Sequence, residues 1–181
     1  MDHQGRPIPR PIDPLPYPHC FVILPPDTVT KDRTLYPPLV IKTLLPDSMR
    51  GHTINAMPCG MDADDRVRPV LQGNFAHQGK IVDEYVPDAG GSSSSGGGGG
   101  DGSGYHTVYF VFSHLTFTST GAYKIRLSLW DMEDYGYLGD IDTDFFDVIR
   151  RSARRQVPNH QEAATMEYLR EAGFDDMPAS T

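Results

Sequence analysis

The sequence is poor in cysteine and has no long apolar run, and each shortage excludes a class of protein. Cys20 and Cys59 are the only cysteines among 181 residues, too few for a disulfide framework. Because no secretion signal precedes them, we expect reduced thiols in a cytosolic or nuclear setting. No stretch approaches the ~18 apolar residues of a membrane helix. We therefore expect no membrane partner.

Basic residues are also scarce. The chain holds 16 Lys and Arg against 24 Asp and Glu, for a formal net charge of −8. Neutralising the phosphates of a nucleic acid requires basic side chains, so this charge argues against sequence-independent nucleic-acid binding by the whole surface. A local basic patch remains compatible with this charge.

Glycine and proline, by contrast, are abundant. The chain contains 18 Gly and 16 Pro, well above average usage, which predicts a loop-rich β protein. Six prolines fall within residues 1–18, a stretch that we interpret either as an extended arm along the domain or as a disordered leader. Residues 19–178 are predicted to form one β-sandwich domain. Residues 88–104 are almost entirely Gly and Ser and are predicted to be a flexible insertion.

The densest apolar segment runs from Tyr105 to Trp130. Apolar residues alternate with others in both halves, and this period of two predicts two strands, each with one buried face. Residues 118–121 (TSTG) have turn chemistry, so the segment is predicted to be a β-hairpin. Lys124 and Arg126 are predicted to be solvated on its outer face. The predicted core face of the second strand is Tyr123, Ile125, Leu127 and Leu129.

Shorter strands and one helix complete the predicted fold. Asn159 and Glu162 have capping-box spacing at the start of a helix that ends before Gly173. The pattern predicts an all-β, immunoglobulin-like sandwich of about seven strands with a C-terminal helix. The acidic stretch 131–147 is predicted to be mainly a solvated loop. Further strands are predicted at 19–24, 36–45, 54–57, 70–75, 80–82 and 145–148.

No residue pattern argues for catalysis, a metal or a cofactor. The seven histidines lack zinc-type spacing. Asp140, Asp142 and Asp144 begin like a calcium loop, but the required Gly and Glu are missing at the later positions. The glycine tract lacks the preceding strand and following helix of a dinucleotide fingerprint. We therefore predict that the protein is not an enzyme and binds no cofactor.

The strongest chemical feature is a run of arginines. Residues 150–155 (RRSARR) contain four arginines directly after a predicted strand. Arginine forms bidentate hydrogen bonds with phosphate oxygens, so the run is a candidate anion site. The alternative is that it neutralises the acidic stretch before it. Arg151, Arg154 and Arg155 are taken as candidate DNA contacts on this ground.

Several motifs resemble those of the velvet domain of fungal developmental and secondary-metabolism regulators. Residues 109–130 (YFVFSHLTFTSTGAYKIRLSLW) resemble its F-x-F-x-D-L-x-x-x-x-x-G-x-[FY]-x-[LF]-[RK]-[FL]-x-[LI]-[FW] segment, with His114 in place of the usual Asp. Residues 71–73 with 81–83 resemble its L-x-G…L-x-D segment. Residues 146–158 resemble its F-x-V-x-S-A-[KR]-x-F-P segment.

Velvet domains usually carry G-x-K-D-R-R-P-I-D-P-P-P, whose basic residues contact DNA. In one placement, Gly5 and residues 10–16 (RPIDPLP) match this motif. This placement is preferred because RPIDP is the longer run and leaves the right number of strands before Leu71. It makes Arg10 the implied DNA contact, with Arg6 beside it.

In the other placement, residues 31–33 (KDR) match the same motif. Lys31 and Arg33 are then the implied DNA contacts. The basic part of the motif is incomplete in both placements.

The resemblance implies a sandwich similar to that of Rel-type transcription factors. It also implies a regulator of transcription in fungal development, sporulation and secondary metabolism. Such a protein would act in the nucleus, shuttle with the cytoplasm, and bind double-stranded DNA as a homodimer or with another velvet-family protein. The alternative is an interaction module that does not contact DNA and modulates another velvet protein or nuclear regulator.

Overall fold

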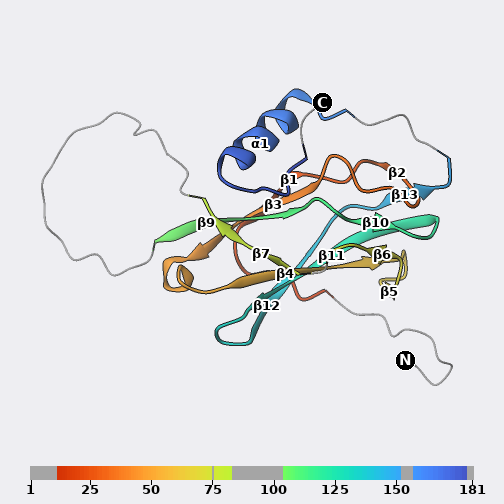
Figure 1. Ribbon diagram of the computed structural model, residues 1–181. Helices are drawn as coiled ribbons and strands as arrows, with labels where there is room; N and C mark the ends of the chain where they lie inside the picture. The colour runs from red at the N-terminus through yellow and green to blue at the C-terminus, as the bar shows by residue number, and fades with distance from the viewer. Residues whose placement is uncertain (1–11, 75, 83–103, 152–156, 179–181) are drawn as a thin grey trace, which may run out of the picture.

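Two β-sheets packed face to face, with one helix outside them, make up the computed structural model of the protein (Figure 1). The structure describes residues 12–74, 76–82, 104–151 and 157–178. Most of the predicted proline-rich arm, and all of the predicted Gly/Ser insertion except Gly104, lie outside the described residues. Among the described residues, no helix is long and apolar enough to span a membrane.

The first sheet has four antiparallel strands in the order β1-β3-β9-β8. Its central pair, β3 and β9, is in register from Leu39 opposite Phe112 to Pro46 opposite Tyr105. The strands are β1 (His19–Ile23), β3 (Leu39–Pro46), β8 (Lys80–Ile81) and β9 (Tyr105–Phe112).

The second sheet has seven strands and follows the order β2-β13-β11-β4-β5. Two more strands join it at its sides, because β12 pairs with β11 and β7 pairs with β4. β2 and β13 pair in parallel. The strands are β2 (Thr28–Thr30), β4 (Ile54–Met61), β5 (Val67–Arg68), β7 (His77–Gln78), β11 (Gly121–Asp131), β12 (Gly136–Asp142) and β13 (Phe146–Ile149).

Two small elements complete the sandwich. β6 (Leu71–Gln72) and β10 (Thr116–Phe117) pair antiparallel as a separate two-stranded sheet. A single 3-10 turn, η1 (Asp47–Met49), follows β3.

The main core lies between the two sheets. The side chains predicted for the core face of β11 are all buried: Tyr123, Ile125, Leu127 and Leu129. They belong to the same hydrophobic cluster as inward-facing side chains of the first sheet, including Ile41, Val108, Phe110 and Phe112. Burial of this shared apolar surface is the main force that holds the sheets together.

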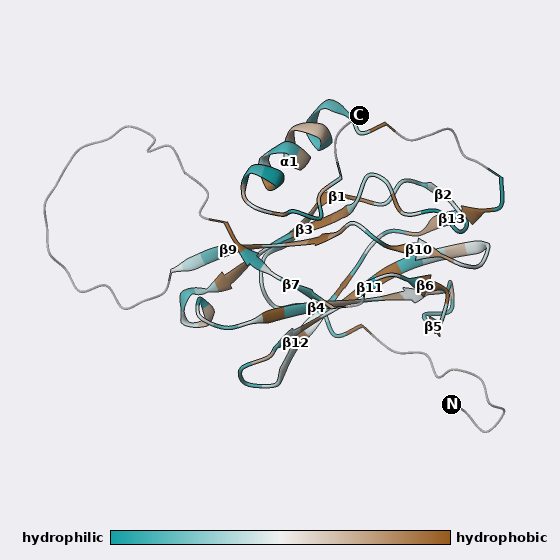
Figure 2. Cartoon of the chain, viewed as in Figure 1, coloured by the Kyte–Doolittle hydropathy of each residue, from teal (hydrophilic) through white to brown (hydrophobic). Residues whose placement is uncertain are grey.

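The helix α1 (His160–Glu171) covers the outer face of the first sheet. Asn159 and Glu162 form the predicted capping box, which satisfies backbone N–H groups at the start of the helix. Gly173 has φ +86 just past the C-terminus, and Phe174 N–H donates to Leu169 O at 3.0 Å, which is a Schellman ending. In Figure 2 most of α1 is coloured hydrophilic, which agrees with its having two buried residues, Met166 and Leu169.

The predicted fold class is confirmed: the chain is an all-β sandwich with a C-terminal helix. The described residues form thirteen strands, more than the predicted number of about seven, and seven of these strands have four or more residues. They are β1, β3, β4, β9, β11, β12 and β13.

The predicted hairpin between residues 105 and 130 is wrong. β9 pairs with β3 and β8 in one sheet, whereas β11 pairs with β4, β12 and β13 in the other. The two strands face each other across the core and are not hydrogen-bonded neighbours. β9 is also buried on both faces, because Val108 and Phe110 face the core while Tyr109 and Val111 pack in the cluster under α1. Alternation identified the strands but carries no information about their partners.

The prediction that Arg126 and Lys124 are solvated is also wrong. Arg126 is 1% exposed and donates to both carboxylate oxygens of Asp142, at 2.7 and 2.8 Å. Lys124 is half-buried and pairs with Asp142 at 2.7 Å and with Asp65 at 2.6 Å. Burial raises the pKa of Asp142, but the hydrogen bonds from Arg126 and Lys124 outweigh it and hold that pKa below its ordinary value.

These ion pairs correct the prediction of a solvated acidic loop as well. Part of the acidic stretch forms β12, which pairs with β11 and ends at Asp142. Asp140, in the middle of this strand, is 1% exposed and accepts a hydrogen bond from Ser128 Oγ at 2.7 Å. The carboxylates of β12 thus neutralise Arg126 and Lys124 of β11 and accept a hydrogen bond from Ser128.

The described end of the N-terminal stretch is attached to β12. Asp140 N–H donates to Asp13 O at 2.6 Å, and Leu15 N–H donates to Asp140 O at 3.0 Å. Leu15 is buried in the main core cluster. Gly139 has φ +143, and a Cβ there would lie 2.5 Å from the Leu15 Cα, so glycine permits this close approach.

Candidate functional site

Positive charge gathers where β2 and β13 end. The two strands are parallel, with Thr30 opposite Ile149, and Lys31 N–H donates to Ile149 O at 2.8 Å. Since parallel strands end at the same edge of a sheet, the residues that follow them emerge side by side. We call this surface the basic edge; its members are Lys31, Arg33, Arg150 and Arg151.

The side chains of the basic edge are accessible. Arg33, Arg150 and Arg151 are exposed, and Lys31 is half-exposed. Lys31 also pairs with the exposed Asp32 carboxylate at 3.2 Å. An exposed pair of this kind is weak, so Lys31 remains able to bind another anion.

The turn that carries Lys31 and Arg33 is fixed by its backbone. Asp32 lies in the left-handed region with φ 59, which Asp tolerates better than most residues, and its N–H donates to Phe117 O at 2.8 Å. Leu35, 1% exposed, anchors the chain after the turn, and its N–H donates to Leu115 O at 2.7 Å. The basic side chains therefore project from a positioned turn.

The structure brings together three of the seven residues predicted to contact DNA, namely Lys31, Arg33 and Arg151. The other four, Arg6, Arg10, Arg154 and Arg155, lie outside the described residues. Arg150 belongs to the predicted arginine run but was not among the chosen contacts, and it lies at the same edge. The sequence showed the run; it did not show that residues 30 and 149 are adjacent.

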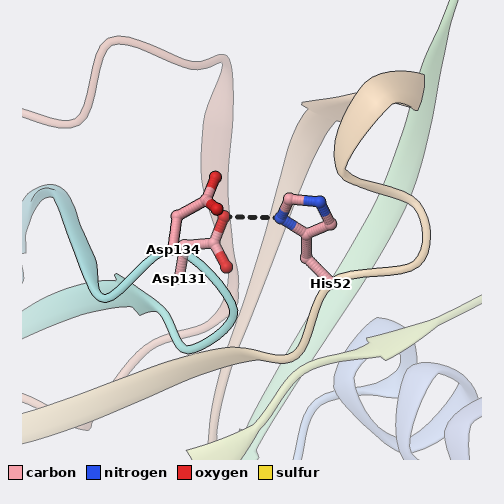
Figure 3. Close-up of side chains that lie close together, drawn as sticks. All are labelled: His52, Asp131 and Asp134. Carbon is pink, nitrogen blue, oxygen red and sulfur yellow. Dashed lines mark hydrogen bonds and ion pairs between the residues drawn. The ribbon is translucent and has the colours of Figure 1, made fainter.

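A second group of candidate functional side chains lies at the opposite end of β11. His52 precedes β4, Asp131 ends β11, and Asp134 lies in the turn between β11 and β12 (Figure 3). We call these three residues the His52 cluster. Their potential ligand atoms all lie within 4.8 Å of one another, and His52 Nδ1 lies 2.7 Å from Asp131 Oδ2.

The charges of the His52 cluster shift two pKa values. The hydrogen bond to Asp131 raises the pKa of His52 against the opposing effect of burial, and the nearby Asp134 and Glu133 carboxylates add to the rise. Burial raises the pKa of Asp131, but hydrogen bonds from His52 and the Glu133 N–H outweigh it and lower that pKa. The two shifts favour an ionised Asp131 carboxylate beside a His52 imidazole that is readily protonated.

Sequence reasoning missed the His52 cluster because it searched for ligands at short spacing. His52 and Asp131 are 79 residues apart in the chain and meet only because β4 and β11 pair in register to Ile54 opposite Asp131. The acidic triplet at 131, 133 and 134 was visible in the sequence, but nothing there indicated a histidine partner.

A third surface feature is apolar and lies on the outer face of the second sheet. Trp130 and Tyr137 form a tilted ring pair with centroids 5.1 Å apart. Met57, opposite Ser128 on the neighbouring strand, is 47% exposed, and Tyr135 in the adjoining turn is 83% exposed. Aromatic and Met side chains of this kind are enriched in protein interfaces.

Comparison with known proteins gives no relative: no family model matches the chain, and no match was found among curated proteins.

Proposed function

We propose that the protein is a velvet-type regulator of transcription in fungal development, sporulation and secondary metabolism that binds double-stranded DNA through the basic edge. The observation that carries the proposal is the convergence of Lys31 and Arg33 with Arg150 and Arg151 in a chain whose net charge is −8. Such a cluster in an acidic protein concentrates positive potential where a phosphate backbone can reach it.

The position of β1 and the contacts of Asp13 and Leu15 support the second placement of the velvet motif over the first. The velvet family has a first strand before this motif, and with residues 31–33 as the K-D-R match, β1 lies in that place. With residues 10–16 as the match, Asp13 and Leu15 are engaged on β12, and Leu15 is buried. We therefore favour Lys31 and Arg33 as the principal DNA contacts.

The basic edge suits contact with the DNA backbone. Arginine and lysine at this edge would bind phosphate oxygens, which position a protein on DNA without reading its sequence. If all four side chains each neutralised one phosphate, the logarithm of the binding constant would fall with the logarithm of salt concentration with a slope of about −3.6. Arg6, Arg10, Arg154 and Arg155 would add to this slope.

A direct test compares DNA affinity at low salt for the full chain and the variant Lys31→Ala/Arg151→Ala. We expect a loss of about 10-fold or more, because two phosphate contacts are removed. Arg50→Ala is the matched control, since Arg50 is 50% exposed and lies near the other end of β11. Equal affinities for all three proteins, alone and with a velvet-family partner, would contradict the proposal.

The same proposal includes a partner and a location. A velvet-type protein would act in the nucleus, shuttle with the cytoplasm, and pair with itself or with another velvet-family protein. Co-purification with such a protein and concentration-dependent sedimentation test the pairing.

The alternative is an interaction module that modulates another velvet protein or nuclear regulator without touching DNA. The exposed apolar face around Met57, Trp130 and Tyr137 favours it. Under this alternative, Met57→Lys would abolish partner binding, and the Lys31→Ala/Arg151→Ala variant would behave like the unmodified protein.

A further inference from the structure

We propose that the His52 cluster is a binding site for a divalent transition-metal ion of the Zn²⁺ type, held by His52, Asp131 and Asp134. The ion would bridge the connection before β4 and the turn between β11 and β12 (Figure 3). The site is separate from the basic edge, and the proposal does not depend on DNA binding.

The geometry of the His52 cluster fits three ligands of one ion. In a tetrahedral site with bonds of about 2.1 Å, two ligand atoms lie about 3.4 Å apart. Here the ligand atoms of all three side chains lie within 4.8 Å of one another, and His52 Nδ1 and Asp131 Oδ2, 2.7 Å apart in a hydrogen bond, would move apart as the ion replaces the shared proton. Asp134 is exposed, so its carboxylate can adjust by rotation. A site of this kind leaves the fourth position to water.

Two of the three ligands are held in place by the fold. Asp131 is 3% exposed, and its Oδ1 accepts the Glu133 N–H at 3.0 Å, which leaves Oδ2 facing His52. The His52 backbone N–H donates to Met49 O at 2.9 Å, and the Thr53 carbonyl accepts the Met132 N–H at 2.9 Å. The first bond fixes the turn that carries His52, and the second joins the two ligand-bearing segments.

The charge of the site also favours a cation. The Asp131 side chain is 3% exposed, and its carboxylate lies in the same cluster as the Asp134 carboxylate. The partner of the buried carboxylate is the His52 imidazole, which supplies at most a single positive charge. Bringing carboxylates together under partial burial is costly unless a cation compensates them, and a divalent ion does so more fully than one proton.

The donor set selects the class of ion. One imidazole nitrogen with two carboxylate oxygens suits Zn²⁺ and neighbouring first-row metals. Calcium and magnesium prefer sites built from oxygen ligands alone. We therefore expect Zn²⁺ or Co²⁺ to bind more tightly than Mg²⁺ or Ca²⁺.

The test is a calorimetric titration of the full, chelator-treated chain with Zn²⁺, together with Co²⁺ absorption spectroscopy. We expect one saturable equivalent of Zn²⁺, a Co²⁺ spectrum with nitrogen and oxygen ligation, and a higher thermal unfolding midpoint in the presence of metal. His52→Gln and Asp134→Asn should each weaken binding at least 10-fold. His160→Gln, which alters an exposed histidine at the start of α1, is the matched control and should bind normally.

Asp134→Asn keeps the proposal falsifiable, because an exposed turn residue can be changed without loss of the fold. Its unfolding midpoint without metal should equal that of the unmodified chain. No saturable Zn²⁺ binding by the unmodified chain, or equal binding by the unmodified, His52→Gln and Asp134→Asn proteins, would overturn the proposal.

Discussion

The same sheet carries arginine in two opposite settings. Arg126, in the middle of β11, is 1% exposed and is held by Asp142 in a bidentate pair. Arg150 and Arg151, just past the end of β13, are exposed beside Lys31. Neighbouring segments cause the difference: β12 places the Asp142 carboxylate next to Arg126, whereas the turn after parallel β2 places Lys31 next to the end of β13.

This difference separates a structural role from a binding role. A buried guanidinium must keep its carboxylate, because an unpaired buried charge is very costly. Clustered exposed cations contribute little to stability and are disposed to bind an external anion. Changes at Arg126 and its partners should therefore act on folding, and changes at the basic edge on DNA binding.

The largest effect is expected from Asp142→Asn. It removes the bidentate carboxylate of the buried Arg126 and leaves that guanidinium the more distant Asp65 carboxylate at 3.6 Å, so we expect a loss of about 3 kcal/mol in the free energy of unfolding. Urea unfolding measures it. Asp144→Asn, at an exposed position two residues further on, is the control and should change stability by less than about 0.5 kcal/mol. Equal stability of the two variants would mean that the pair is not structural.

The same pair should make stability depend on acid. The folded pKa of Asp142 lies below its ordinary value of 3.8. Its stabilising contribution is thus complete above the unfolded pKa and disappears as the pH falls through the folded one. Unfolding curves from about pH 5 to pH 2 should show a smaller loss for Asp142→Asn than for the unmodified chain. A parallel loss in both proteins would assign the acid sensitivity to other carboxyl groups.

A smaller effect is expected at the start of α1. Asn159→Ala removes the side chain that caps the Glu162 N–H, which should cost about 1 kcal/mol of unfolding free energy. DNA affinity should not change, because the helix lies on the first sheet. Asn159→Asp, which preserves a capping oxygen, should retain the stability; if it loses as much as Asn159→Ala, the cap is not the cause.

The smallest effect is expected from Asp32→Asn within the basic edge. The change removes the carboxylate that pairs with Lys31, and Asn accepts the same left-handed backbone. DNA affinity should rise about threefold, the size of an exposed charge effect, with no change in unfolding. Fluorescence anisotropy with labelled DNA measures the gain. A decrease in affinity would argue that Asp32 itself positions the binding turn.

Local signals in the sequence predicted the local structure well. The capping box at Asn159 and the glycine ending at Gly173 fixed both ends of α1, because each involves residues only a few positions apart. Alternation predicted β11 and its core face. The same alternation did not predict the pairing partner of β9 or the burial of Arg126, because both depend on which distant strands pair.

The two candidate sites likewise could not be predicted from local sequence patterns. Lys31 and Arg33 are implied by the family motif and Arg151 by the arginine run, and no pattern in the sequence places the three together. Only the parallel pairing of β2 with β13 makes them one surface. The His52 cluster likewise depends on the register of β4 against β11, which no short motif encodes.

The most direct test of the basic edge is the salt dependence of DNA binding. The unmodified chain and the variant Lys31→Ala/Arg33→Ala/Arg150→Ala/Arg151→Ala are titrated with duplex DNA from about 50 to 200 mM salt, a range over which phosphate contacts weaken strongly. We expect a slope steeper by about three to four units for the unmodified chain, because four phosphate contacts are lost in the variant. Identical slopes, with both proteins equally folded, would contradict it.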